Sequence, residues 1–326
     1  MHTALLPVNL IRSLAAVAAG VLVAGHAAAQ YPSKPIRILL PFPAGGVVDT
    51  VTRIITQPLS QSLGQTIVIE AKPGADGQIA AMEARKSAPD GYTLFLGTTT
   101  SMSMVPALRK NPPYNPIADF TPISHMGAGA FFVFVHSDVP ASSLEQLVSH
   151  ARANPGKVAY ASGTAFAIAA TAHFMQHAKI QMLHVPYKGE VAALPDFITG
   201  RIQVMFATPS LIMQHIKDGK LRALAVLLPQ RSGLLPNVPT MLELGYPEVP
   251  VTSWSGFFGP ANLPPEITER LSREINAILA RTSVREELDG RGIMAHGTSP
   301  DALRQVVKSQ LDAWHRAVRD GWVRQE

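Results

Sequence analysis

The chain has 326 residues, of which 47% are hydrophobic and 16% charged, and a formal net charge of +5. These proportions exclude a disordered chain. The sequence contains no cysteine, which excludes a disulfide, a thiolate metal site, a cysteine nucleophile and a lipid-modified cysteine. The basic residues are scattered and form no run interleaved with aromatic residues, so nucleic-acid binding is disfavoured.

The first 29 residues have the order of a secretory signal peptide. Arg12 supplies a positive charge, residues 13–25 are almost wholly apolar, and Ala27-Ala28-Ala29 provides an A-x-A cleavage signal before Gln30. The apolar stretch is short for a bilayer span, although an uncleaved anchor stays open as an alternative. We therefore expect residues 1–29 to be a signal peptide, which leaves about 300 residues, enough for two domains.

After the signal peptide, short apolar runs rich in β-branched residues alternate with longer segments of helical period. The predicted strands are 36–40, 66–70, 93–97, 131–135, 158–161, 182–185, 202–207 and 221–228. The predicted helices are 47–63, 78–87, 143–153, 167–177 and 192–199. This alternation predicts an α/β fold with mostly parallel sheets.

Several element boundaries can be read from local signals. Pro58 is expected to kink or divide the first long helix, and Ser142 with Glu145 forms a capping box for the helix over 143–153. Pro264-Pro265 opens an amphipathic helix, and the last helix carries an apolar stripe that we expect to dock on a core. A strand-like segment at 254–258 suggests that the chain returns to its first domain.

A double glycine follows the first predicted strand, in Pro41-Phe42-Pro43-Ala44-Gly45-Gly46. Two consecutive glycines allow a positive φ and a close approach of a ligand to the main chain. The helix that begins near Val47 directs unpaired N–H groups at this turn, which favours a carboxylate or another anion. Asp49 either caps these N–H groups or accepts from a donor on the ligand. A plain strand–helix connection without a ligand is equally compatible with this motif.

Two other polar turns occupy equivalent places. Gly97-Thr98-Thr99-Thr100-Ser101 and Ser162-Gly163-Thr164 each follow a predicted strand. Ligands of open α/β sheets bind beyond the carboxyl ends of the strands. Three such turns therefore indicate a binding site, although each alone is compatible with an ordinary turn.

Motifs for catalysis and metal binding are weak. Trp254-Ser255-Gly256 lacks the leading glycine of a nucleophile elbow. Ser162 and His173 have no spacing that would place them together as a nucleophile and base. His173 and His177 could share a helix face, but the glutamate of the H-E-x-x-H motif is missing, so packed or surface histidines are the better interpretation. We expect no catalytic site, no metal and no cofactor.

Five blocks of sequence resemble one known family. They are residues 41–49 (PFPAGGVVD), 72–80 (KPGADGQIA), 89–94 (PDGYTL), 184–189 (HVPYKG) and 237–245 (NVPTMLELG). In this order they resemble the Bug proteins, or TctC family, the extracytoplasmic receptors of tripartite tricarboxylate transporters. The resemblance runs from about Tyr31 to near the C-terminus.

The resemblance implies a type II periplasmic binding protein fold with a ligand cleft between two domains. Domain 1 would comprise residues 30–130 and 251–326, and domain 2 residues 131–250. The implied ligand is a small carboxylate, the implied partners are the integral-membrane permease subunits, and the location is the periplasm. We expect a monomer. The residues expected to bind the ligand are Phe42, Ala44, Gly45, Gly46, Asp49, Thr98, Thr99, Ser162, Gly163, Thr164 and Tyr187.

The chain also departs from the family pattern. Ala207 stands where many members have an aspartate, and Phe166 stands where small polar residues are common. These changes favour an aromatic or otherwise partly apolar carboxylate over a ligand with an amino group. The leading hypothesis is a solute-binding receptor that captures its ligand by hinge closure. A periplasmic adaptor that presents the ligand to a membrane kinase, and a periplasmic hydrolase, are the alternatives.

Overall fold

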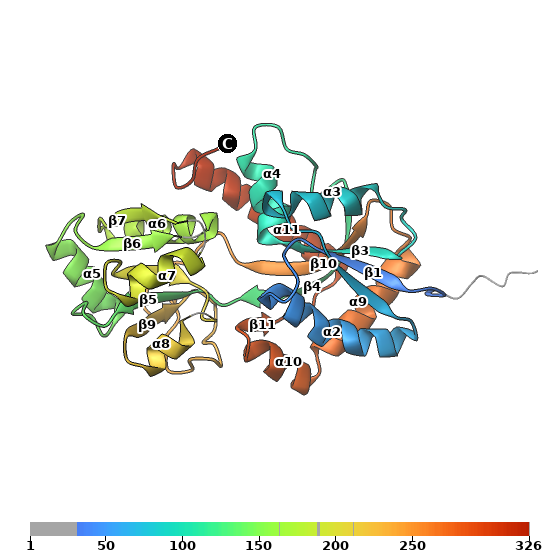
Figure 1. The fold of residues 1–326 in the computed structure, drawn as a ribbon. Helices are drawn as coiled ribbons and strands as arrows, with labels where there is room; N and C mark the ends of the chain where they lie inside the picture. Colours follow the sequence, from blue (N-terminus) through green and yellow to red (C-terminus); the bar gives the residue numbers. More distant parts are fainter. Residues whose placement is uncertain (1–30, 163, 188–189, 211, 326) are drawn as a thin grey trace, which may run out of the picture.

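The computed structural model describes residues 31–162, 164–187, 190–210 and 212–325. Its strands form two sheets that lie side by side and are joined by two crossings of the chain (Figure 1). One sheet has the strand order β11-β4-β10-β3-β1-β2 and the other β7-β6-β8-β5-β9. The expected α/β fold is confirmed, but the sheets are mixed rather than mostly parallel, because β10 and β5 are antiparallel to both of their neighbours and β11 is antiparallel to β4. The expected signal peptide lies outside the described residues.

The first sheet and its helices come from both ends of the chain. The strands are β1 (Ile36–Leu40), β2 (Ile67–Ala71), β3 (Thr93–Thr98), β4 (Phe120–Gly129), β10 (Trp254–Pro260) and β11 (Ile293–Ala295). The helices are α2 (Val47–Leu63), α3 (Gln78–Lys86), α4 (Val105–Leu108), α9 (Pro265–Leu279), α10 (Thr282–Asp289) and α11 (Pro300–Arg319), with a 3₁₀ turn η1 (Ala75–Gly77) and a π-helical turn η2 (Thr100–Met104).

The second sheet and its helices come from the middle of the chain. The strands are β5 (Phe132–His136), β6 (Ala159–Ser162), β7 (Leu183–Pro186), β8 (Val204–Ala207) and β9 (Leu221–Val226). The helices are α5 (Leu144–Ala153), α6 (Ala165–Ala178), α7 (Glu190–Ile198) and α8 (Met213–Lys217).

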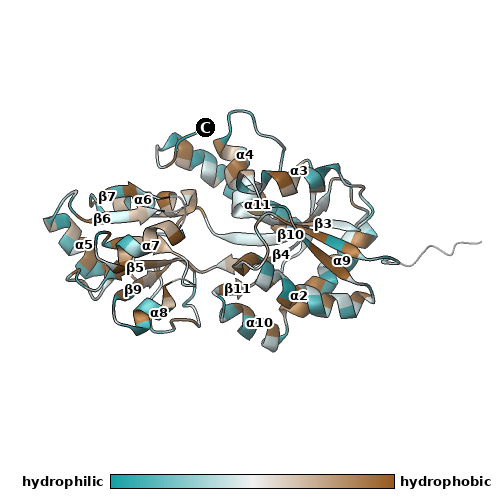
Figure 2. Cartoon of the chain, viewed as in Figure 1, coloured by the Kyte–Doolittle hydropathy of each residue, from teal (hydrophilic) through white to brown (hydrophobic). Residues whose placement is uncertain are grey.

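Each sheet is covered by helices on both faces. In β1, Ile36, Ile38 and Leu40 pack with α2 and α9, whereas Leu39 packs with α3 and α11 on the other face. A strand that is buried on both faces has a continuous apolar sequence, whereas a helix that packs with one side has a single apolar stripe. Figure 2 shows this difference, since β5 is hydrophobic up to its final His136 and the helices carry both colours.

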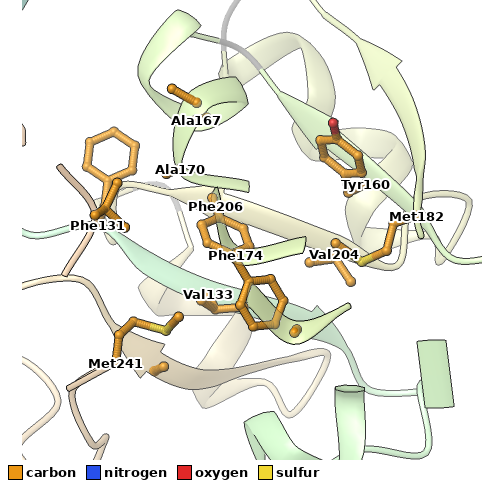
Figure 3. Packing of buried hydrophobic residues seen from close by; sticks show 14 of the residues in the cluster. Phe131, Val133, Tyr160, Ala167, Ala170, Phe174, Met182, Val204, Phe206 and Met241 are labelled. Atoms are coloured by element: carbon orange, nitrogen blue, oxygen red, sulfur yellow. The ribbon is translucent and has the colours of Figure 1, made fainter. Parts of the chain in front are cut away.

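The core of the second sheet is rich in aromatic side chains. The rings of Phe174 on α6 and Phe206 on β8 lie 5.7 Å apart, and Figure 3 shows them in contact with Val133 of β5 close by. Phe131 lies at the margin of this cluster, where the chain enters β5. The margin of the aromatic core therefore reaches the crossing between the sheets.

Two predicted boundary features differ in the structure. Helix α2 is not divided at Pro58, because Ile55, Leu59 and Leu63 are buried on the same stripe and hold both halves on the sheet. The proline removes a single N–H donor, which this packing outweighs. The effect of Pro58 on the direction of the helix stays a prediction.

The capping box of α5 is displaced by one residue. Ser143, not Ser142, is the N-cap, and its Oγ accepts from the N–H of Gln146. The Oε1 atom of Gln146 accepts in return from the N–H of Ser142. The reciprocal pattern resembles a capping box, with Gln146 rather than Glu145 and with the return bond at Ser142, the residue before the N-cap, rather than at the N-cap itself.

The chain crosses twice between the sheets. It leaves β4 at Gly129 and enters β5 at Phe132, and it returns after β9 through residues 227–253 to β10 at Trp254. The expected return of the chain to its first sheet is confirmed. The far end of α11 also joins the core of the second sheet, since Trp314 packs in the same cluster as Phe131. The exact domain boundaries, after residue 130 and after residue 250, stay a prediction.

A buried histidine lies where β4 meets β10, the two strands of the first sheet that lead into and out of the crossings. His125 of β4 stacks on Trp254 of β10 with ring centroids 6.0 Å apart, and its Nδ1 donates to the carbonyl of His296 at 2.9 Å. Burial lowers the pKa of His125 to about 4. The imidazole is therefore neutral in the folded protein at pH 7.

Acid is expected to destabilise the fold through His125. Its folded pKa of about 4 lies below the value of about 6.5 in an unfolded chain, so only the unfolded chain binds this proton between those pH values. The free energy of unfolding should therefore fall by about 2 kcal/mol between pH 7 and pH 5 from this residue alone. Urea unfolding at both pH values measures it. In His125→Asn, which retains a hydrogen-bond donor, the loss of stability between pH 7 and pH 5 should be smaller by this amount. A loss of stability equal to that of the wild type would contradict the assignment of the effect to His125.

Candidate functional site

The carboxyl ends of the strands face the gap between the sheets. β1 and β3 are parallel, and β4 runs in the same direction because both β3 and β4 are antiparallel to β10. In the second sheet β6, β7 and β8 are parallel, and β5 begins beside the end of β8, where Phe132 pairs with Ala207. Since the chain crosses from the end of β4 to the start of β5, the turns after β1, β3, β6, β7 and β8 all adjoin the gap.

A first cavity, the hinge cavity, lies where both crossings meet the two domains. It has a volume of about 390 Å³ and includes Phe131 from one crossing and Ser253 from the other. The other residues that line it are Phe42, Asp76, Thr99, Thr100, Met104, Leu108, Thr164, Ala165, Phe166 and Trp314. Three predicted site residues, Phe42, Thr99 and Thr164, therefore come together here.

A second cavity, the glycine cavity, also has walls from both sides of the gap. It has a volume of about 320 Å³ and is lined by Gly45, Val47, Thr50, Pro209, Ser210, Met213, Leu234, Gly290 and Arg291. Because Phe42 lines the hinge cavity and Gly45 the glycine cavity, the turn after β1 lies between the two spaces. The neighbouring Ala44 and Gly46 are exposed but line neither cavity.

The glycine turn has the conformation that its sequence requires. Gly45 has φ +80°, a conformation that side chains rarely adopt, and Gly46 is the extended N-cap of α2 without a side-chain cap. The carboxylate of Asp49, only 5% exposed, accepts from the N–H of Gly45 at 2.8 Å, and Arg53 Nε lies 3.0 Å from its other oxygen. Of the two roles considered for Asp49, the structure shows the main-chain one. The N–H groups of the first turn of α2 have no cap.

Thr98 and Thr99 are both buried but differ in their partners. The N–H of Thr98 donates to Ser101 Oγ, and its hydroxyl faces the same serine at 3.4 Å. The hydroxyl of Thr99 donates to the carbonyl of Thr252 at 2.7 Å and accepts from the N–H of Trp254 at 2.8 Å. Thr99 therefore connects the turn after β3 to the second crossing, while Thr98 stays within its own turn and does not line either cavity.

The second sheet contributes Ser162, Thr164 and Tyr187. Ser162 Oγ lies 2.6 Å from His184 Nε2, and Thr164 is the N-cap of α6, where its hydroxyl accepts from Ala167. Tyr187 donates its hydroxyl to Asp196 at 2.7 Å, and this bond raises the pKa of Tyr187. Ser162 and Tyr187 line neither cavity, and Gly163 lies outside the described residues.

The partner of Ser162 is His184 rather than His173. A serine–histidine hydrogen bond also occurs in catalytic triads, where a carboxylate orients the histidine. Within the described residues, however, no carboxylate bonds to His184, whose ring stacks on Tyr160 at 4.9 Å. Burial lowers the pKa of His184. This pair holds the start of the turn after β6 and lacks the acid that would orient a catalytic base.

Of the two histidines of α6, His173 is buried and His177 is exposed, which agrees with the expectation of packed or surface histidines. The rings of His173 and His177 lie 4.3 Å apart, and His177 Nδ1 donates to the carbonyl of His173 at 2.9 Å. Burial lowers the pKa of His173 to about 4. In the part of the chain that the structure describes, no group of three acidic or histidine side chains could hold a metal ion.

The sequence did not predict an acid beside Ala207, where the family pattern places one. Glu190, in the first turn of α7, accepts from the hydroxyl of Thr208 at 2.6 Å and from its N–H at 3.3 Å. Burial raises the pKa of Glu190. An acid from another element therefore lies beside Ala207, and the preference for a ligand without an amino group now rests on the apolar lining of the cavities alone.

The sequence also missed residues that the fold brings to the cavities. Phe131 and Ser253 reach the hinge cavity from the crossings, Trp314 from the last helix, and Arg291 reaches the glycine cavity from the turn after α10. Only Arg291, between two glycines, had a local signal of an unusual turn. The others occupy segments with no distinctive motif.

Comparison with known proteins agrees with this architecture. The family described as "Tripartite tricarboxylate transporter family receptor" (TctC) matches residues 51–321. Protein BugT of Bordetella pertussis is 33% identical over 96% of this chain and 98% of its own. Among the described residues, no helix has the length and apolar character needed to cross a membrane.

Two solved structures are similar over nearly their whole length. R. palustris Rpa4515 with adipate has a TM-score of 0.76 and 28% identity, covering 89% of this chain and 97% of that one. MatC from Rhodopseudomonas palustris with bound malate has a TM-score of 0.70 and 28% identity, covering 88% and 100%. The neighbours are periplasmic binding proteins and not enzymes, so the hydrolase alternative is set aside. The chain belongs to the TctC family, the receptors of tripartite tricarboxylate transporters, and is a periplasmic solute-binding receptor of the Bug type.

Proposed function

We propose that the chain captures a small, partly apolar carboxylate between its two domains and delivers it to the permease subunits of a tripartite tricarboxylate transporter. The observation that carries this proposal is that both cavities have walls from both domains and adjoin the glycine turn. Residues 1–29 would direct export to the periplasm. The mature receptor would be a monomer with domain 1 at 30–130 and 251–326 and domain 2 at 131–250.

The anchor for the carboxylate is the start of α2. Its first N–H groups follow Gly46, carry no side-chain cap and lie at the positive end of the helix dipole. The bond from Gly45 to Asp49 holds the turn in its left-handed conformation, so the anchor is formed before the ligand arrives. A preorganised site loses less entropy on binding.

The apolar part of the ligand is expected to contact the hinge cavity. The rings of Phe131 and Phe166 lie 4.5 Å apart in an edge-to-face arrangement, and the remaining apolar residues of the lining are Phe42, Met104, Leu108, Ala165 and Trp314. A cavity of about 390 Å³ is within the usual size for a small ligand. The adipate bound by the related R. palustris protein is itself a carboxylate with an apolar chain.

Closure of the two domains would complete the site. The hinge is formed by the two crossings, and a ligand that contacts both domains favours the closed state by its additional contacts there. Thr164 and the start of α6 would approach the ligand from domain 2. Exclusion of water strengthens the charge-assisted hydrogen bonds to the carboxylate.

A thermal-shift panel of carboxylates tests the proposal. Aromatic and aliphatic acids should raise the unfolding temperature, because a ligand present at 100 times its Kd stabilises the folded state by about 2.7 kcal/mol. Matched amides and alcohols, which lack the negative charge, should give no shift. A clear preference for aspartate or glutamate over aromatic acids would contradict the apolar ligand, and stabilisation by the uncharged analogues would contradict carboxylate capture.

A further inference from the structure

The glycine cavity contains a cationic side chain that the carboxylate anchor does not need. Arg291 is the one ionisable side chain among the described residues that line this cavity. Around it, Val47, Pro209, Met213 and Leu234 are apolar. The cavity therefore combines an uncapped helix start, an arginine side chain and apolar residues, three of which (Pro209, Met213 and Leu234) come from the opposite domain.

The backbone holds Arg291 where the two domains touch. Its N–H donates to the carbonyl of Leu288 at 3.0 Å, and the carbonyl of the next residue, Gly292, accepts from Ala130 in the first crossing at 2.7 Å. A Cβ atom on Gly292 would lie 3.2 Å from Pro209 and 3.3 Å from Leu234, so this turn is packed against domain 2. Arg291 is thus carried on a turn that is bonded to the hinge.

The acidic groups near Arg291 leave its charge available. Glu287, one turn back on α10, lies 3.5 Å from its Nη2, and both side chains are about half exposed. Exposed pairs of this kind contribute about 0–1 kcal/mol, so a ligand oxygen can replace Glu287 at little cost. Asp289 instead bonds to the N–H of Gly233, and Asp49 to Gly45 and Arg53.

We infer that Arg291 is a specificity residue that selects ligands with a second carboxylate. The inference rests on the proposed function, in which the start of α2 binds the first carboxylate. In a diacid the guanidinium then pairs with the second carboxylate and the spacer lies along the apolar lining of the glycine cavity, whereas a monoacid places its apolar part in the hinge cavity. The ligand class is a dicarboxylate with an apolar spacer, aliphatic or aromatic.

Calorimetry on matched pairs of acids tests this inference. Adipate is compared with hexanoate, and terephthalate with benzoate, so that each pair differs by one carboxylate. Wild-type protein should bind at least one diacid about tenfold or more tightly than its partner, the factor expected of one charge-assisted contact. Arg291→Gln should remove this advantage and leave the affinity for the monoacid unchanged, and Arg291→Lys should retain much of it.

The control is Arg281→Gln, which makes the same change of charge at the N-cap of α10 and should bind all four acids as the wild type does. Equal losses for diacid and monoacid in Arg291→Gln, or no loss for either, would overturn the role of Arg291. Equal affinity of the wild type for both members of each pair would overturn it too, while carboxylate capture would stand. Failure of the wild type to bind any of the four acids would count against both.

Discussion

Gly45→Asp is expected to abolish carboxylate binding without unfolding the protein. A Cβ atom at Gly45 would meet no atom within 4 Å, so there is space for the new side chain at the cost of strain at φ +80°, and it would place a negative charge in the glycine cavity. Like charges brought together in a closed site cost several kcal/mol. The Kd should therefore rise about 100-fold or more. Calorimetry with the ligand identified by the thermal-shift panel measures this change.

Gly45→Asn is the matched control. Asparagine has nearly the shape of aspartate, carries no charge, and tolerates the left-handed conformation at φ +80° better than most residues. It should bear the same conformational cost and lose only a few-fold in affinity. Similar losses in both variants would assign the effect to backbone strain, and normal affinity in Gly45→Asp would place the carboxylate elsewhere.

Thr99→Val should destabilise the protein more than other threonine substitutions. The hydroxyl of Thr99 pairs with the carbonyl of Thr252 and the N–H of Trp254, and valine of similar shape leaves both backbone groups without this partner. Each buried group left unpaired costs about 1–3 kcal/mol. We expect the free energy of unfolding to fall by about 2–4 kcal/mol, measured by urea denaturation.

Thr199→Val is the comparison for this loss. The hydroxyl of Thr199 donates to the carbonyl of Pro195 at an exposed helix end, where water replaces it. Its cost should stay within about 0.5 kcal/mol. If the two variants lose the same stability, the connection from Thr99 to the second crossing contributes nothing particular to the hinge. A normal Kd with reduced stability in Thr99→Val would limit its role to support of the hinge.

Most elements of the fold were predictable because their signals are local. The helix predicted over 47–63 is α2 with the same bounds, and β1 coincides with the first predicted strand. In these segments the spacing of the apolar residues and the flanking glycines predict the same element that burial in the core favours. The glycine turn was predictable for the same reason, since Gly45 takes the positive φ that a double glycine permits.

The strand β4 was not predicted, although it is the longest in the first sheet. Its sequence, FTPISHMGAG, contains a proline and two glycines, which local propensity disfavours in a strand. It forms because β10 pairs along its whole length and β11 pairs with its end, with irregularities in register between Ser255 and Gly256 and between Phe257 and Phe258. Its partners lie more than 100 residues away, so no sequence window contains the cause.

The same limit applies to the candidate site. Phe42, Gly45, Thr99 and Thr164 were found because they follow strands, and strand ends in such sheets share one edge. The sequence could not predict which hydroxyl groups remain available to bind a ligand. Thr99 bonds to the second crossing, and Ser162 bonds to His184. These hydrogen-bond partners depend on how the folded chain places the turns relative to one another.

By itself, the sequence determined most of the alternation of strands and helices, the left-handed turn at Gly45 and the family of the chain, because each depends on neighbouring residues or on recurrent motifs. Only the tertiary structure decided that Arg291 and Phe131 reach the cavities, and that Thr99 bonds to the second crossing. The physical reason is that a cavity between domains is enclosed by segments that become neighbours only when the chain crosses twice between its two sheets.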